Sequence, residues 1–268
     1  MNKIPNSIIV LLALLSLLTF LIPLVLAFIL KKKKPQVKWA SFLVGCVIMF
    51  VFALVIESSL HNLILGSSIG PSIINNAFLY ALYGGLMAAL FEESGRYIAF
   101  EFLLKKERDT DENSIMYGLG HGGIEMILLY SLSMVSNIVL ITIINSGVDL
   151  ATLAPGENGQ ALAQVSNTLL ETHWSMYLLG FFERISALIA QVSLSIFVWM
   201  GVKHKQFKYV LYAFLGHFLL DFVTAYLSRS QMVSMYVLEI IIFVGAILLA
   251  LFARSVWKKL HQEVSNDD

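Results

Sequence analysis

Seven apolar stretches, each about as long as a bilayer-spanning helix, take up nearly all of this chain. They lie at about residues 7–30, 38–58, 76–104, 114–145, 173–201, 208–228 and 231–253. Of the 268 residues, 58% are hydrophobic and only 13% are charged, which excludes an ordinary soluble domain. The pattern predicts a single integral membrane domain over residues 1–268. Its fold class is all-α, a polytopic membrane helix bundle with about seven transmembrane helices.

The basic residues between these stretches predict the orientation of the bundle. They form four clusters, at Lys31–Lys34 with Lys38, at Lys105, Lys106 and Arg108, at Lys203, Lys205 and Lys208, and at Arg254, Lys258 and Lys259. With seven spans, all four clusters fall on one side, which the positive-inside rule makes the cytoplasm. We therefore expect a multi-pass protein of the cell membrane with its N-terminus outside and its C-terminus cytoplasmic. On the outer side, Gln160–Thr172 is predicted to form a short helix in the interface.

Two adjacent glutamates, Glu92 and Glu93, stand inside the third apolar stretch and are followed by Arg96. Charged side chains at membrane depth are costly to keep, so they mark a functional site by default. Residues three and four positions apart share a helix face. Arg96 is therefore expected to pair with the glutamates and to neutralise them.

Two further apolar stretches each carry a histidine with an acidic residue four positions later. These pairs are His121 with Glu125 and His217 with Asp221. At a rise of about 1.5 Å per residue, Glu92, His121 and His217 lie roughly 20, 18 and 14 Å from the ends of their stretches that carry the basic clusters. The three stretches thus bring ligand-type side chains to a similar level, and Glu125 and Asp221 are expected to orient the histidines.

These residue types suit metal-assisted hydrolysis. Two histidines and one carboxylate can hold Zn²⁺ and leave a fourth position for water. The ion lowers the pKa of that water to about 7, and a neighbouring carboxylate can take its proton. The spacing does not decide which glutamate is the ligand and which is the base. Cys46 is the only cysteine, so a cysteine-based metal cluster is excluded.

The motifs Glu92-Glu93-x-x-Arg96, His121 and His217-x-x-x-Asp221 resemble those of a family of intramembrane metalloproteases. These are related to the CAAX prenyl proteases and bacteriocin-processing enzymes, and the nearest resemblance is to the YhfC-type family, over about residues 38–253. The resemblance implies a peptidase acting on a membrane-embedded or membrane-associated protein or peptide. It implies Glu92 and Glu93 as catalytic residues, Glu93, His121 and His217 as ligands of Zn²⁺, and Arg96, Glu125 and Asp221 in support.

A proton- or cation-coupled transporter is the alternative, because buried Glu, His and Asp can also form an ion relay. A zero net charge gives no indication of nucleic-acid binding. The hydrolytic site is expected to open toward the cytoplasmic half. Glu183 and Arg184 are expected to neutralise each other nearer the outer face, and Glu57 and His61 are expected at the interface.

Overall fold

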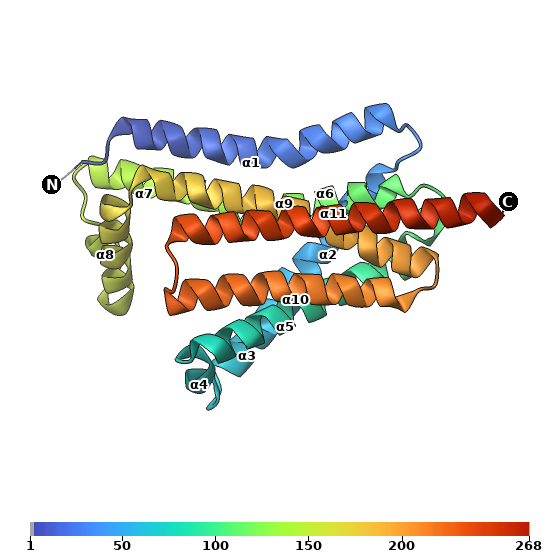
Figure 1. The fold of residues 1–268 in the computed structure, drawn as a ribbon. Helices are drawn as coiled ribbons and strands as arrows, with labels where there is room; N and C mark the ends of the chain where they lie inside the picture. The colour runs from blue at the N-terminus through green and yellow to red at the C-terminus, as the bar shows by residue number, and fades with distance from the viewer. Residues whose placement is uncertain (1–2, 268) are drawn as a thin grey trace. The chain divides into compact units, whose positions relative to one another are not determined.

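The computed structural model describes residues 3–267, with side chains through residue 262, and the described residues form helices joined by short turns (Figure 1). The α-helices are α1 (Asn6–Lys33), α2 (Trp39–Met49), α3 (Ser58–Leu65), α4 (Gly70–Ile74), α5 (Ala77–Ile98), α6 (Glu112–Met126), α7 (Leu132–Asn145), α8 (Gly156–Glu171), α9 (Trp174–Lys203), α10 (Phe207–Ser230) and α11 (Met235–Asp267). Wider helical turns continue three of them, η1 (Phe50–Glu57) after α2, η2 (Ala99–Leu103) after α5 and η4 (Ile127–Ser131) after α6; η3 (Lys105–Glu107) and η5 (Leu150–Leu153) are single tight turns. The predicted all-α membrane bundle is confirmed.

Six of the described helices are long and apolar enough to cross a membrane. They are Asn6–Lys33, Trp39–Leu65, Glu112–Asn145, Trp174–Lys203, Phe207–Ser230 and Met235–Gln262. Helix α5 with η2 is of similar length, and it carries Glu92, Glu93 and Arg96 inside its apolar stretch. These three charges set α5 apart from the other six. A bundle of about seven spans, with α5 as the charged one, agrees with the sequence.

The second helix runs further than expected. Its apolar stretch was predicted to end near residue 58, whereas the helix continues through η1 and α3 to Leu65. Residues 50–65 contain no glycine or proline, and the first such residue after them is Gly66. Glu57 and His61 therefore lie on a helix, one turn apart.

The chain divides into two compact units, and each is described separately. The first comprises Met1–Ile22 with Glu125–Arg184. In it the hydroxyl groups of Thr19 and Ser131 lie 2.6 Å apart, and Asn145 Oδ1 accepts a hydrogen bond from the Ile4 amide at 2.9 Å. Helix α8 belongs to this unit and confirms the predicted short helix, which begins at Gly156. Its place in the membrane interface stays a prediction.

The second unit comprises Pro23–Ile124 with Ile185–Asp268, and it contains α5 packed along α10. A methyl group on Gly85 of α5 would lie 3.0 Å from the carbonyl oxygen of Phe218 in α10. On α6, a methyl group on Gly120 would overlap the carbonyl oxygen of Phe42 in α2. Small residues allow helix backbones in a membrane to approach this closely. The approach brings the polar faces of α5, α6 and α10 within reach of one another.

Candidate functional site

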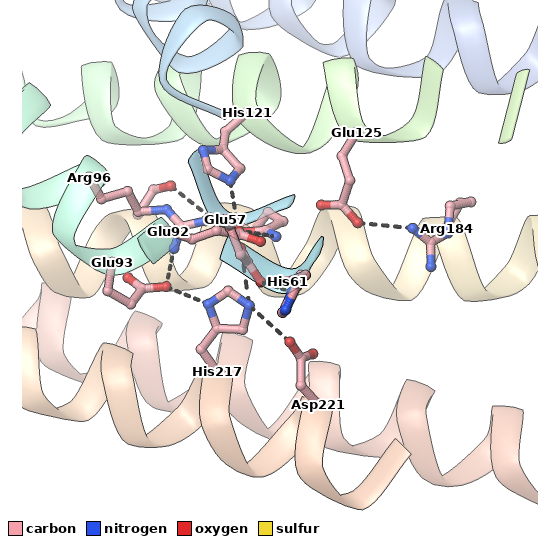
Figure 2. Close-up of polar contacts among 12 residues, drawn as sticks. Glu57, His61, Glu92, Glu93, Arg96, His121, Glu125, Arg184, His217 and Asp221 are labelled. Carbon is pink, nitrogen blue, oxygen red and sulfur yellow. Dashed lines mark hydrogen bonds and ion pairs between the residues drawn. The ribbon is translucent and has the colours of Figure 1, made fainter. Parts of the chain in front are cut away.

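Four helices of the second unit bring most of the predicted site residues into one buried cluster (Figure 2). The polar cluster consists of Glu92, Glu93 and Arg96 from α5, His121 from α6, Gln191 from α9, and His217 and Asp221 from α10. The two glutamates, the arginine and the two histidines are each at most 7% exposed. So many ionisable groups are kept at this depth only when they are paired.

Glu92 is the centre of the polar cluster. Its Oε2 atom lies 2.9 Å from His121 Nε2, and it accepts a hydrogen bond from Gln191 Nε2 at 3.0 Å. The same oxygen lies 3.5 Å from Arg96 Nη2 and 4.0 Å from His217 Nε2. Groups from four helices therefore converge on one carboxylate oxygen.

Glu93 holds His217 from the opposite side of its ring. Glu93 Oε1 lies 2.7 Å from His217 Nδ1 and also accepts a hydrogen bond from Arg96 Nη1. His217 Nε2 is then directed toward Glu92 and toward Asp221, whose Oδ2 atom is 3.4 Å away. Glu93 thus fixes the orientation of His217, a role the sequence assigned to Asp221 alone.

Arg96 links the two glutamates, as the spacing along α5 predicts. Its side chain is completely buried, and it also donates a hydrogen bond to Gln191 Oε1. One guanidinium therefore faces two carboxylates, and the amide of Gln191 joins Arg96 to Glu92. Gln191 was not singled out in the sequence, although a glutamine in the middle of an apolar stretch is a signal of a buried polar contact.

Glu125 has a hydrogen-bond partner other than His121, the residue it is predicted to orient. The Glu125 carboxylate accepts a hydrogen bond from Arg184 Nη1 at 2.9 Å, and Arg184 is also paired with Glu183. His121 Nδ1 is buried and has no hydrogen-bond partner in the part of the chain described. The i,i+4 spacing allowed Glu125 to reach His121, but a guanidinium offers the carboxylate a full opposite charge and a directed donor.

Glu57 and His61 belong to the surroundings of the polar cluster, and their position at the membrane interface stays a prediction. Glu57 is 7% exposed, and its Oε1 atom lies 3.0 Å from His61 Nε2. His61 Nδ1 lies 2.8 Å from the hydroxyl of Tyr83 on α5. His61 also lines the same cavity as Asp221. The sequence missed His61 because the second helix was predicted to end near residue 58, before this histidine.

A cavity of about 870 Å³ borders the polar cluster at Asp221, whose side chain is 42% exposed. Its wall includes His61 of α3, Tyr83 and Gly84 near the start of α5, and Thr224 near the end of α10. The cavity, called here the large cavity, lies away from the end where the basic clusters gather. The large cavity lies where Gly84 and other small side chains leave space, and the expected opening toward the cytoplasmic half stays a prediction.

A second opening lies between α5 and α10, on the side of the basic clusters. This α5/α10 groove has a volume of about 560 Å³ and reaches Glu93. The groove is lined mostly by apolar and aromatic side chains, among them Leu90, Tyr97, Leu211 and Phe214. The polar cluster is thus approached by the large cavity from one end and by the apolar groove from the other.

Comparison with known proteins places this arrangement in a family. The family described as YhfC intramembrane metalloprotease matches residues 18–242, which contain every residue of the polar cluster. The chain belongs to the YhfC family. It is 34% identical over 241 residues to a protein named "Uncharacterized membrane protein YhfC" from Bacillus subtilis (strain 168), covering 90% of this chain and 93% of that relative. No solved structure matches the chain.

The YhfC family description implies a metal, and the side chains of the polar cluster suit one in kind. His121 Nε2 and His217 Nε2 lie 2.9 and 4.0 Å from Glu92 Oε2. Ligand atoms on one tetrahedral zinc lie about 3.3 Å apart, because each bond is about 2.0 Å long. Within the described residues, no group of three or more His, Cys, Asp or Glu is already arranged to hold an ion. The donors are therefore of a suitable kind without being arranged as a metal site, and Glu92, not Glu93, is the carboxylate near both Nε2 atoms.

Proposed function

We propose that this YhfC-family protein is an intramembrane peptidase that hydrolyses a peptide bond of a membrane-embedded or membrane-associated protein or peptide. The observation that carries the proposal is the convergence of His121, His217 and Gln191 on one buried oxygen of Glu92, beside a cavity of about 870 Å³. A buried carboxylate with fixed neighbours beside a large cavity is the usual setting of acid–base chemistry. The family description supports the same class of reaction.

Glu92 is the residue proposed to activate the water. Arg96 hydrogen-bonds to Glu93, whereas its distance to Glu92 is 3.5 Å, so Glu93 is the more firmly engaged carboxylate. A water beside Glu92 would lose its proton to that carboxylate as its oxygen attacks the scissile carbonyl carbon. The proton then passes to the amine that leaves when the carbon–nitrogen bond breaks.

His217 is proposed to stabilise the reaction intermediate, and Asp221 is proposed to exchange protons with solvent. Glu93 holds His217 Nδ1, so Nε2 faces Asp221 and Glu92, and the protonated ring can donate a hydrogen bond from Nε2 to the oxyanion of the tetrahedral intermediate. Asp221 contacts His217 and lines the large cavity, so it can exchange protons with solvent there. In a metal-bound form, His121, His217 and Glu92 would hold the ion, and the ion in place of His217 would polarise the carbonyl and lower the pKa of the water.

A metal-content measurement tests the proposed cofactor. We expect about one zinc ion per chain in protein purified in detergent without chelators, and loss of that ion in the His121→Ala/His217→Ala double variant. Elemental mass spectrometry gives the ratio directly. His173→Ala serves as the control, since His173 Nδ1 bonds to Ser175 and not to the polar cluster. Equal metal in all three proteins would show that the histidines are not ligands, and no metal in any would leave Glu92 to act alone.

A cavity-filling variant tests whether the large cavity admits the substrate. A methyl group on Gly84 would meet no atom within 4 Å, so Gly84→Ala should fold and cleave like the wild type. Gly84→Leu should fill the cavity and lower cleavage by about tenfold or more, because displacement of a substrate by about 1 Å can cost a hundredfold in rate. Cleavage is read by co-reconstituting the purified protein with the membrane proteins of cells that lack it and counting new peptide termini by mass spectrometry. Equal cleavage by both variants would exclude this cavity as the substrate route.

A proton- or cation-coupled transporter is a second candidate, because openings approach the polar cluster from both ends. A carrier uses such a site alternately from each side. Proteoliposomes containing a pH-sensitive dye distinguish the two functions. The peptidase proposal predicts no proton flux above that of empty vesicles under an imposed cation gradient. Flux in the wild type that is lost in His217→Ala would favour the transporter.

A further inference from the structure

The α5/α10 groove continues into a smaller pocket at the end of the helices where the basic clusters lie. This basic pocket has a volume of about 360 Å³ and shares Tyr97, Phe207 and Val210 with the groove. Its charged lining consists of Arg108, Lys203, Lys205 and Glu101. Three cations therefore face one anion at the end of an apolar channel.

Only one of these cations lacks a partner. Arg108 donates to Glu101 Oε2 at 2.8 Å and to the Phe100 carbonyl, and Lys203 lies 2.8 Å from Asp111 Oδ1. The Lys205 ammonium is exposed and has no hydrogen bond or ion pair with any residue that the structure describes. The pocket thus offers one uncompensated positive charge together with two others that are already held in place.

The backbone at Lys205 is unusual for a lysine. Its φ is 54°, in the left-handed region, and it is the second residue after α9, which ends at Lys203. The amide of Gln206 closes the helix end by donating to the Gly201 carbonyl at 2.9 Å. Glycine or asparagine usually occupies such a position, because other side chains are strained there. A lysine kept at a strained position at the mouth of a basic pocket points to a role for its charge.

We propose that the groove and the basic pocket together bind one anionic phospholipid. Its phosphate lies at Lys205, flanked by Arg108 and Lys203, and one acyl chain lies in the α5/α10 groove toward Glu93. An anionic phospholipid matches this site because the site is basic at one end and apolar along the rest. Basic pockets between membrane helices are known to hold anionic headgroups. The acyl chain would cover the side of Glu93 that faces the groove and so keep water away from the polar cluster. This site is independent of the reaction proposed above.

Native mass spectrometry of the full-length protein in detergent tests the lipid site. The wild type is titrated with phosphatidylglycerol or phosphatidylcholine, which share acyl chains and differ in headgroup charge. We expect the first retained lipid to be phosphatidylglycerol with a preference of about fivefold, as one basic residue near the headgroup provides. Lys205→Asn removes the charge and suits the left-handed backbone, so it should fold and lose most of that preference. Lys33→Asn removes an exposed lysine outside the basic pocket and should keep it.

Two further measurements identify the occupant. Ser94→Trp, an exposed position that lines the groove, should weaken retention of both lipids by filling the place of the acyl chain. Soluble glycerol 3-phosphate should not displace phosphatidylglycerol at matched concentration, because it lacks the chain. Displacement by glycerol 3-phosphate would overturn the proposal in favour of a free-phosphate site. Equal retention of the two lipids by the wild type, or equal losses in Lys205→Asn and Lys33→Asn, would overturn it as well.

Discussion

Replacing Arg96 by methionine is expected to lower the free energy of unfolding by about 3–5 kcal/mol, the cost of removing one partner from a buried ion pair. Arg96 is completely buried and faces both Glu92 and Glu93. Methionine fills similar space and leaves the two carboxylates without their cation. Steric trapping in detergent micelles measures the change.

Two companion variants show whether the loss comes from charge. Arg254→Met, on the exposed face of α11, should change the free energy of unfolding by no more than about 0.5 kcal/mol. Adding Glu93→Gln to Arg96→Met should recover part of the loss, because one of the stranded charges is removed. A loss that is unchanged in the double variant would indicate that packing, and not the ion pairs, makes Arg96 necessary.

Replacing Glu92 by glutamine is expected to lower peptide cleavage by about a thousandfold or more, because general-base catalysis alone contributes about 10²–10⁴ in rate. Glutamine keeps the size of the side chain and cannot take a proton from water. The rate is measured by the appearance of new peptide termini in the co-reconstituted system. Thermal unfolding of the same samples shows whether the variant is folded.

Substitutions of two other glutamates, Glu93 and Glu183, are the comparisons for Glu92→Gln. Glu93→Gln should leave measurable cleavage and reduce stability, since Glu93 serves mainly to hold His217 and to pair with Arg96. Glu183→Gln should leave cleavage largely intact, because Glu183 is paired with Arg184 and takes no part in the polar cluster. If Glu93→Gln abolishes cleavage while Glu92→Gln retains it, the two roles are exchanged.

The long apolar stretches made most of the fold predictable, because the requirement to satisfy backbone polar groups in lipid leaves helices as the natural solution. The site residues were predictable for a related reason. Glu92, His121 and His217 are each expensive at membrane depth, and their levels could be matched from helix rise alone. Helix rise gives depth along a helix, and the structure then supplied the contacts between helices.

The hydrogen-bond partners of the site residues were harder to predict from the sequence than their depth in the membrane. Glu125 shares a helix face with His121, but its hydrogen bond comes from Arg184, which is distant in sequence. Gln191 reaches both Glu92 and Arg96 from α9, and a single uncharged amide carries little signal among apolar residues. The direction of the large cavity depends on where small side chains such as Gly84 leave space, which spacing along one helix does not reveal.

Hydrolysis in isotopically labelled water tests the central claim most directly. The purified protein is co-reconstituted with membrane proteins of cells that lack it, in water enriched in ¹⁸O, and new C-termini are examined by mass spectrometry. Attack by a water activated at Glu92 predicts new C-termini carrying one ¹⁸O atom in the wild type and in Glu183→Gln, and their absence in Glu92→Gln. Labelled termini at equal abundance in Glu92→Gln, or none in folded wild-type protein, would contradict the account.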